Sequence, residues 1–460
     1  MSGVLGSLRG KTMGTPSPSS VSTKLQRIAE LASQSPPLVL TSLSHHIDIE
    51  FLREAHRLTR KDGAVGVDGQ TAQEYAENLE ANLQGLLGRF KTGTYKAPPV
   101  RRVLIPKGDG KQTRPIGVPT FEDKVLQRAV TMVLEAVYEQ DFLACSYGFR
   151  RGRSPHTALQ ALWESLMPTG GGWVLEVDIQ KFFDHLDHSQ LRSFLDQRVR
   201  DGVVRRAIDK WLKAGVLEDG SVLHPESGTP QGGVISPLLA NIYLHEVVDK
   251  WFEHEIKPRL SGRAALFRYA DDMVMVFTGE RDAQRVLQVL PKRLARFGLS
   301  LHPEKTRLVK FRRPSYDPPP CGGGRADRPG TFDLLGFTHF WGRSRRGRWV
   351  VHRKTAKDRF RRALKAANLW CRRHRHAPIV WQHRELSAKI RGHCAYYGIT
   401  GNSRSLWLFR FKLLRLWRRW LSRRSQRGRL TWEAFGHLVE RFPLPPASAI
   451  HSLCRRVANP

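Results

Sequence analysis

Two kinds of hydrophobic pattern alternate along the chain. Apolar runs rich in β-forming residues occur at 173–179 (WVLEVDI) and 265–277 (ALFRYADDMVMVF), and both predict strands. Helical spacing of apolar positions predicts helices at 121–140, 187–199, 237–254, 281–297, 355–376 and 404–424. Turns are expected at Gly392, Gly398 and Gly401. The pattern therefore predicts a mixed α/β middle followed by a helical region.

Two stretches lack these patterns. Residues 1–45 are rich in Ser, Thr, Gly and Pro, so we expect a flexible N-terminal segment with one or two short helices near its end. Residues 315–330 are rich in Pro and Gly, which predicts a loop or insertion between ordered parts.

The charge is strongly basic and unevenly placed. The 76 Lys and Arg residues exceed the 42 Asp and Glu residues by 34, which predicts a polyanionic partner, nucleic acid before an anionic membrane. Residues 341–430 hold 27 of the basic residues, two acids and seven of the twelve tryptophans. A solvated helix face is the alternative, but this density favours an RNA-binding helical domain, with Arg on phosphates and Trp packing the helices or stacking on bases.

Several classes of protein are disfavoured. No run of 18 apolar residues is present, and the N-terminus lacks the pattern of a signal peptide, so neither a membrane span nor secretion is expected. The five cysteines are scattered without a CxxC pair, which argues against a zinc ribbon or a disulfide framework. We therefore expect a cytoplasmic protein, in the bacterial cytosol or nucleoid.

Two acidic motifs carry candidate chemistry. In FRYADDMVMVF, apolar β-formers flank Asp271 and Asp272, which predicts a hairpin whose turn presents both acids. Adjacent carboxylates repel each other unless a cation offsets the charge; a polar turn is the alternative. Asp178 ends the strand WVLEVDI, and could converge with the hairpin in one sheet. Three such carboxylates would suit two Mg²⁺ ions about 3.5–4 Å apart.

Seven blocks together resemble reverse transcriptases, and specifically the group II intron-encoded reverse transcriptase/maturase family. In chain order they are VRRVLIPKGDGKQTRPIGVPTFEDKVLQRAV, YGFRRGRSPHTAL, WVLEVDIQKFFDHLDH, SGTPQGGVISPLLANIYLHEVVD, FRYADDMVMVF, GLSLHPEKTRLVKF and FDLLGFTHF. The resemblance covers about residues 50–435, and the order of the blocks makes a chance match very improbable.

The resemblance implies an α+β fold of the right-hand polymerase type. Its fingers and palm, with an antiparallel palm sheet, would be followed by an α-helical thumb and a helical maturase domain. The implied segments are a flexible N-terminal segment at 1–45, fingers and palm at 46–340, thumb at 341–378, a maturase-like RNA-binding domain at 379–440 and a C-terminal tail at 441–460. The chain stops about 25 residues after TWEAF without paired Cys and His, so we expect the form without an endonuclease domain.

The resemblance also implies site residues. Asp178, Asp271 and Asp272 would be catalytic, and two Mg²⁺ ions, replaceable by Mn²⁺, would contact Asp178, Ile179, Asp271 and Asp272. Phe183 would crowd a ribonucleotide 2′-OH, whereas Phe182 better fits a core position. The implied nucleotide-binding residues are Lys107, Arg114, Phe183, Gln231, Gly232 and Lys305. Generic surface positions remain alternatives for the two lysines and for Arg114.

In the maturase-like part, Arg391, Tyr396, Tyr397 and Arg404 are the candidate RNA-binding residues. Core packing is an equal alternative for the two tyrosines. The implied partners are intron RNA, an RNA template with a DNA primer, dNTPs and target DNA. No membrane partner is expected, and a homodimer stays open.

These features predict an RNA-directed DNA polymerase of a group II intron that also binds its intron RNA to assist splicing and mobility. One alternative is a mainly non-catalytic RNA-binding splicing factor, which the presence of all three aspartates disfavours. Another alternative is a domesticated reverse transcriptase, for example in phage defence. An intron RNA around the coding region would distinguish that alternative.

Overall fold

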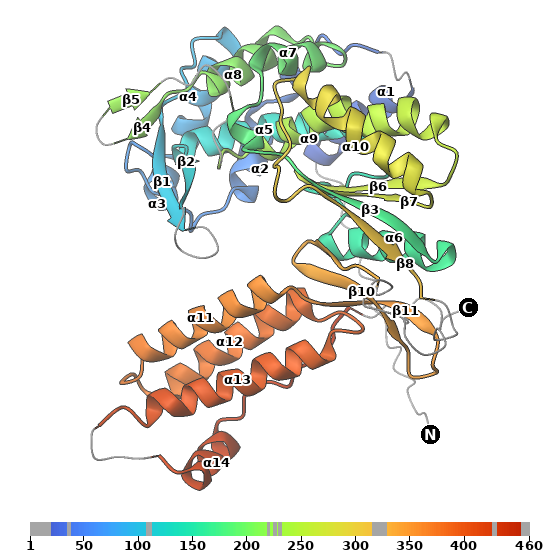
Figure 1. The fold of residues 1–460 in the computed structure, drawn as a ribbon. Helices are drawn as coiled ribbons and strands as arrows, with labels where there is room; N and C mark the ends of the chain where they lie inside the picture. Colours follow the sequence, from blue (N-terminus) through green and yellow to red (C-terminus); the bar gives the residue numbers. More distant parts are fainter. Residues whose placement is uncertain are drawn as a thin grey trace, which may run out of the picture. The chain divides into compact units, whose positions relative to one another are not determined.

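The computed structural model describes residues 20–34, 38–106, 113–218, 221–223, 228, 232–314, 329–425 and 430–451. The chain forms two compact units, whose elements are labelled in Figure 1. Unit 1 joins Met1–Pro98, Pro119–Asp141 and Leu195–Trp211, and unit 2 joins Pro99–Val118, Phe142–Phe194 and Leu212–Pro460. Each unit therefore brings together segments that lie far apart in the sequence.

Unit 1 is helical. Its main helices are α1 (Ser20–Gln34), α2 (Ile49–Leu58), α3 (Ala72–Glu77), α4 (Leu79–Thr92), α5 (Phe121–Tyr138) and most of α8 (Gly202–Leu212). Buried residues lie on nearly every side of α5, so this helix is central, and α1 and α2 pack on it. Thr120 begins α5 by accepting a hydrogen bond from the Asp123 backbone N–H at 3.2 Å. The predicted helix at 121–140 is confirmed.

A carboxylate is buried inside unit 1. Asp123 is only 1% exposed, and its Oδ1 accepts hydrogen bonds from the Tyr95 hydroxyl and from Trp211 Nε1, the latter at 2.8 Å. Its Oδ2 accepts one from Gln127 Nε2 at 3.2 Å. Burial raises the pKa of Asp123 to about 6, although these neutral donors act in the opposite direction. The folded protein therefore holds a proton here that an unfolded chain would release.

This raised pKa predicts a pH-dependent stability. Between pH 4 and 6 the folded state binds more protons than the unfolded state, so the free energy of unfolding falls as the pH rises through this window. A difference of two pKa units corresponds to about 3 kcal/mol. Asp123→Asn, which keeps the Oδ1 acceptor, is expected to remove this contribution in denaturation curves measured from pH 4 to 8. The exposed control Glu77→Gln is expected to keep the pH profile of the parent. An Asp123→Asn profile that also runs parallel to that of the parent would contradict the assignment.

Unit 2 contains a four-stranded antiparallel sheet in the order β6-β7-β3-β8. The strands are β3 (Gly171–Asp178), β6 (Ala264–Tyr269), β7 (Asp272–Phe277) and β8 (Arg307–Arg312). Helices α6 (Pro155–Thr169) and α10 (Glu280–Ala295) contact the sheet and lie on opposite faces of it (Figure 1). Because both faces are covered, the central strands are apolar almost throughout, and both predicted strand regions are confirmed.

A second four-stranded sheet of unit 2 has the order β2-β1-β4-β5. Its strands are β1 (Val100–Pro106), β2 (Thr113–Val118), β4 (Val216–Glu218) and β5 (Ser221–Leu223). Strand β1 pairs with β2 antiparallel and with β4 parallel.

A third sheet corrects the expectation of a purely helical thumb from residue 341. Its strands are β9 (Phe332–Leu334), β10 (Phe337–Arg343) and β11 (Trp349–Thr355). Buried and open positions alternate along β10, and β11 buries Val351, Arg353 and Thr355. This period of two is that of a strand, so residues 341–355 complete a sheet before the next helix begins.

In the described part of the chain that follows there are four helices: α11 (Lys357–Arg373), α12 (Ile379–Tyr397), α13 (Ser403–Leu421) and α14 (Trp432–Arg441). They share one apolar core. The turn predicted at Gly392 is wrong, because this residue lies inside α12 beside the buried residues His393 and Cys394, whose packing outweighs the low helix propensity of glycine. Gly398 ends α12, and Gly401 has a φ of +94°, so these two turns are confirmed. Among the described helices, none is both long and apolar enough to cross a membrane.

The helix predicted at 237–254 changes pitch. The structure has α9 (Ser236–Leu244), then π-helical turns at His245–Asp249 and Trp251–Ile256 and a 3-10 turn at Lys257–Arg259. Periodicity alone does not separate these helix types, and π-turns are frequent at functional sites. Between β3 and α8 the chain forms a 3-10 turn at Phe182–Asp184 and α7 (His188–Asp196).

Candidate active site

One end of the β6-β7-β3-β8 sheet carries three aspartates. Asp178 is the last residue of β3, and it lies directly opposite Asp272, the first residue of β7. Residues opposite each other in an antiparallel pair have Cβ atoms about 5 Å apart. Asp271 precedes Asp272 in the tight turn between β6 and β7. The fold therefore brings residues that are more than 90 positions apart into one acidic cluster, as the sequence predicted.

The turn itself differs slightly from the expectation. Tyr269 pairs with Asp272, so the two turn residues are Ala270 and Asp271, and Asp272 belongs to the strand. Ala270 has a φ of +58°, which is uncommon for a residue other than glycine. Two-residue hairpin turns need a positive φ at this position to match the twist of their strands. Surrounding structure must hold alanine in this conformation.

The acidic cluster carries poorly compensated negative charge. Burial raises the pKa of Asp271, although its own backbone N–H and the charge of Arg114 lower it. Asp272 is partly open to the cavity, but desolvation by the surrounding protein raises its pKa to about 6. The N–H of Leu335 lowers this pKa, and the charges of Asp271 and Asp178 raise it further. Such a cluster favours a bound cation.

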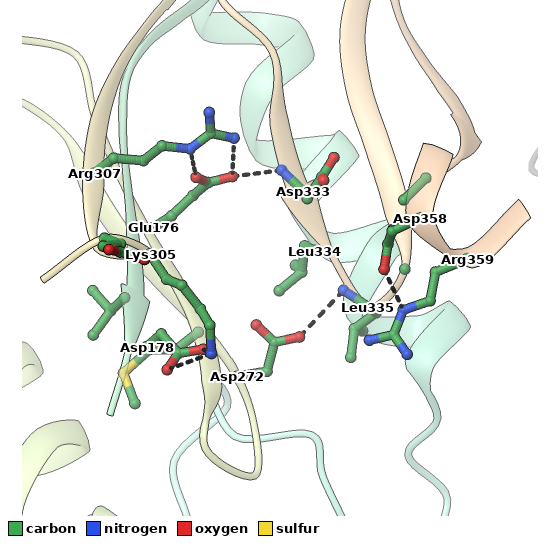
Figure 2. A pocket seen from close by; sticks show the side chains of 15 residues that line it. Glu176, Asp178, Asp272, Lys305, Arg307, Asp333, Leu334, Leu335, Asp358 and Arg359 are labelled. Atoms are coloured by element: carbon green, nitrogen blue, oxygen red, sulfur yellow. Dashed lines mark hydrogen bonds and ion pairs between the residues drawn. The ribbon is translucent and has the colours of Figure 1, made fainter. Parts of the chain in front are cut away.

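Asp178 and Asp272 line a cavity of about 470 Å³ (Figure 2). Its lining includes six acids, Glu176, Asp178, Asp272, Glu304, Asp333 and Asp358, and three cations, Lys305, Arg307 and Arg359. The cavity is therefore acidic by three formal charges in a protein whose net charge is +34. Lys305 Nζ lies 3.2 Å from Asp178 Oδ2, and Arg307 makes a two-point ion pair with Glu176.

The three carboxylates do not yet converge. Asp178 is directed toward Lys305, whereas Asp272 Oδ2 accepts a hydrogen bond from the Leu335 N–H at 3.3 Å (Figure 2). Within the described part of the chain, no three His, Cys, Asp or Glu side chains form a ready-made metal cluster. The donor chemistry nevertheless fits Mg²⁺, which prefers carboxylate oxygens, and the excess of negative charge fits a cation.

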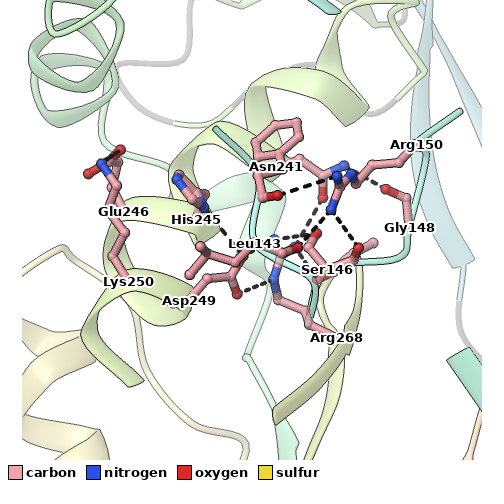
Figure 3. Close-up of polar contacts among 12 residues, drawn as sticks. Leu143, Ser146, Gly148, Arg150, Asn241, His245, Glu246, Asp249, Lys250 and Arg268 are labelled. Atoms are coloured by element: carbon pink, nitrogen blue, oxygen red, sulfur yellow. Dashed lines mark hydrogen bonds and ion pairs between the residues drawn. The ribbon is translucent and has the colours of Figure 1, made fainter. Parts of the chain in front are cut away.

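A fully buried arginine anchors the hairpin of β6 and β7 (Figure 3). Arg268 is 0% exposed and binds both carboxylate oxygens of Asp249, at 2.7 and 2.5 Å. It also donates to Asn241 Oδ1 at 3.0 Å, Ser146 Oγ at 2.8 Å and the Ala270 carbonyl at 3.1 Å. Burial alone would raise the pKa of Asp249, but the guanidinium outweighs it and holds the pKa below its ordinary value. Arg268 therefore ties the strained turn to the π-helical segment.

The turn is also held from its other side. Gly148 lies so close that a Cβ atom there would come within 2.4 Å of the Ala270 nitrogen. Asn241 Nδ2 fixes this glycine by donating to its carbonyl at 2.6 Å. Contacts to Arg268 and Gly148 together explain how Ala270 keeps its positive φ.

A second strained turn joins the cluster to helix α12. Leu335 and Gly336 form the turn between β9 and β10, with φ values of +52° and +78°. The Leu335 N–H binds Asp272, and the Leu335 carbonyl accepts a hydrogen bond from the Tyr396 hydroxyl at 2.9 Å. Burial raises the pKa of Tyr396 to about 12, so the hydroxyl remains protonated as a donor.

The predicted nucleotide-binding residues are only partly described. Lys107 and Gln231 lie outside the described residues. Arg114 is exposed on β2, and its charge lowers the pKa of Asp271. Lys305 is also exposed, and its contact is with Asp178. These assignments remain predictions.

The remaining predicted positions near the site have identifiable packing. Phe182 is buried, as the sequence indicated, and Phe183 is half-buried. A Cβ atom on Gly232, whose φ is +119°, would lie 2.5 Å from the Gly117 carbonyl oxygen, so glycine is required there by close contact with β2. Ile179 is buried and forms a bridge with Leu301.

The four candidate RNA-binding residues separate into two groups. Arg391 on α12 and Arg404 on α13 are exposed. Tyr396 and Tyr397 are half-buried and pack around Phe337, with ring centroids 5.9 and 5.2 Å away. This geometry favours the packing alternative for the tyrosines, and the RNA contacts remain predictions.

Sequence reasoning did not single out Arg268, Asp249, Asn241 or Gly148. The available signal was a single arginine inside an apolar strand, since a buried charge requires a partner. Its partners Asp249, Asn241 and Ser146 lie 19, 27 and 122 residues away in the sequence. No local sequence pattern could therefore identify them.

Comparison with known proteins agrees with this site. A family model described as reverse transcriptase (RNA-dependent DNA polymerase) matches residues 105–339, about half of the chain and including all three aspartates. The chain belongs to the reverse transcriptase family. Within this family, it is a member of the group II intron-encoded branch.

Three relatives illustrate that membership. The group II intron-encoded protein LtrA of Lactococcus lactis subsp. cremoris is 38% identical over 227 residues, which are 48% of this chain and 37% of LtrA. Protein YkfC of Escherichia coli is 34% identical over 293 residues, 57% of this chain and 77% of YkfC. Nuclear intron maturase 1, a mitochondrial protein of Arabidopsis thaliana, is 33% identical over 95 residues, which are 21% of this chain and 13% of the maturase.

Proposed function

We propose that this protein is an RNA-directed DNA polymerase of a group II intron and that intron RNA is its second partner. The observation that carries the proposal is the placement of Asp178, Asp271 and Asp272 together at one end of an antiparallel sheet inside the family match. We assign this sheet to the palm of a right-hand polymerase fold, α11 to the thumb and α12 to α14 to the maturase-like domain.

Asp178, Asp271 and Asp272 would hold the divalent cations, with Ile179 as a neighbouring contact. Bound there, Mg²⁺ or Mn²⁺ would lower the pKa of the primer 3′-OH and neutralise charge on the nucleoside triphosphate. The negative charge of the acidic cavity supports this assignment, because it is poorly compensated by the protein's own cations.

Other residues would position the substrates. Arg114 would bind the triphosphate with its planar guanidinium, with Lys107 beside it, and Lys305 would contact a phosphate at the cavity. Phe183 would exclude ribonucleotides by crowding the 2′-OH. Gln231 and Gly232 would lie along the nucleotide and template. The substrates would be dNTPs and an RNA template with a DNA primer.

The helical region supports RNA binding. Residues 341–430 carry a net charge of +25, and the side chains of Arg391 and Arg404 are exposed. Phosphate contacts of this kind supply most of the sequence-independent affinity for RNA. The relatives named for introns and maturases support an intron RNA as the partner. Splicing, mobility and insertion at target DNA would be the processes served.

Two measurements test the proposal. Purified protein should extend a DNA primer on an RNA template with dNTPs and Mg²⁺, and the RNA that copurifies with it should contain a structured intron. Extension without an intron would favour a domesticated enzyme, whereas intron binding without extension would favour a splicing factor. The absence of both would overturn the proposal.

The link from α12 to the site gives a further expectation. Tyr396→Phe removes the hydroxyl that holds the Leu335 turn but keeps the ring, and a hydrogen bond contributes about 1 kcal/mol. We expect a several-fold lower kcat for primer extension with little change in the KM for dNTP, because the turn binds Asp272 and not the nucleotide. Tyr397→Phe is the matched control, since among the described residues its hydroxyl has no hydrogen-bond partner. Equal effects of the two variants would argue against the link.

A further inference from the structure

The outward face of α13 carries an unusual stripe of residues. Arg404, Trp407, Phe411 and Arg415 are spaced by three and four positions, so they lie on one side of the helix. The buried side is formed by Leu406, Phe409, Leu413 and Trp417. The stripe therefore faces away from the core that α13 shares with the neighbouring helices.

Two large aromatic rings are open on this face. Trp407 is 58% exposed and Phe411 is 42% exposed. Their ring centroids are 5.2 Å apart and their planes differ by 7°, so the rings lie parallel. The Arg415 guanidinium lies 5.8 Å from the centre of the Phe411 ring. The two rings therefore stack on each other, and this exposed aromatic stack takes no part in the buried core of the helices.

The charge around the rings identifies the kind of partner. Helix α13 has six cations, Arg404, Arg410, Lys412, Arg415, Arg418 and Arg419, and no acid. An apolar protein surface would not require this charge, whereas single-stranded RNA combines phosphates with bases that stack on aromatic side chains. Arg404 and Arg415 are eleven residues apart, about 16 Å along the helix, which places a cation on each side of the rings.

We propose that Trp407 and Phe411 form a stacking site for an unpaired base of bound RNA, with Arg404 and Arg415 contacting the flanking phosphates. This inference rests on the proposed RNA-binding function and specifies single-stranded RNA as the ligand of α13. Paired bases are already stacked in a duplex, so the site distinguishes unpaired from paired RNA.

Binding of a fluorescein-labelled 12-nucleotide RNA, single-stranded or as a blunt duplex, tests the site in the full chain. Trp407→Leu and Phe411→Leu are each expected to weaken single-strand binding about tenfold and to leave duplex binding unchanged. Val380→Ala, at an apolar position of α12 that is 64% exposed, is the control and should change neither. Ultraviolet crosslinking of the parent to the single strand should attach nucleotides to Trp407 or Phe411.

The outcomes separate this inference from the proposed function. If the parent binds both RNAs but the leucine variants match it and no crosslink falls on α13, the stacking site is overturned and RNA binding stands. A parent that binds neither RNA overturns both. If sedimentation shows that the parent self-associates and the variants do not, with unchanged RNA affinity, the face serves a second copy of the chain and the inference is again wrong.

Discussion

Asp271→Asn is expected to lower primer extension at least a thousandfold while RNA binding stays at the parent level. The substitution keeps the shape of the side chain and removes one negative charge from the turn that faces Asp178 and Asp272. A thousandfold loss corresponds to about 4 kcal/mol of transition-state stabilisation, the scale expected when a ligand of catalytic cations is lost. Single-turnover extension on an RNA template measures it.

Two comparisons make this result specific. Asp178→Asn should give a loss of similar size, because it lies opposite the hairpin in the same cluster. Glu280→Gln removes one exposed carboxylate from the first turn of α10 and should extend primers normally. Retention of extension by Asp271→Asn would refute the catalytic assignment, and a parallel loss of RNA binding would point to misfolding.

The second large effect concerns stability. Arg268→Met and Asp249→Leu are each expected to lower the free energy of unfolding by about 3–5 kcal/mol, because each leaves an unpaired charge where both partners are 0% exposed. Glu246→Gln breaks the neighbouring surface pair with Lys250 and should cost at most about 1 kcal/mol (Figure 3). Urea denaturation monitored by tryptophan fluorescence measures the differences.

The double variant separates stability from turn geometry. Arg268→Met with Asp249→Leu removes both charges, so it should unfold closer to the parent than either single variant does. Its primer extension should be as low as that of Arg268→Met alone, because in both variants the Ala270 carbonyl lacks its hydrogen-bond donor. Additive destabilisation would show that the two residues do not act as a pair. Normal extension by the double variant would show that Arg268 does not position the turn.

Local periodicity was sufficient for the main elements of the sheet and its helices. The apolar β-forming run around Asp271 and Asp272 predicted the hairpin, and the strand-end position of Asp178 predicted its place beside the hairpin in one sheet. Periodicity failed where long-range packing decides the local structure. Gly392 stays helical because its neighbours are buried. Residues 341–355 contain strand because β10 and β11 pair with each other, while the earlier part of β10 pairs with β9.

The candidate site shows the same division. Its acidic residues could be predicted because strand ends and turns are visible in sequence. The supports of those residues could not, because each is a contact between distant segments. Gly148 gives no local sign that its Cα lies against Ala270, and Leu335 gives none that its two backbone groups connect Asp272 with Tyr396.

The contacts made by Arg268 have a consequence for how ordered the candidate site is before it binds a ligand. All of the arginine's nitrogen atoms are engaged, and Ala270 is confined between the guanidinium and Gly148. The turn that carries Asp271 is therefore already ordered before any nucleotide arrives. The entropy cost of fixing its dipoles and charge is met when the protein folds, so the proposed reaction would need little reorganisation of this hairpin.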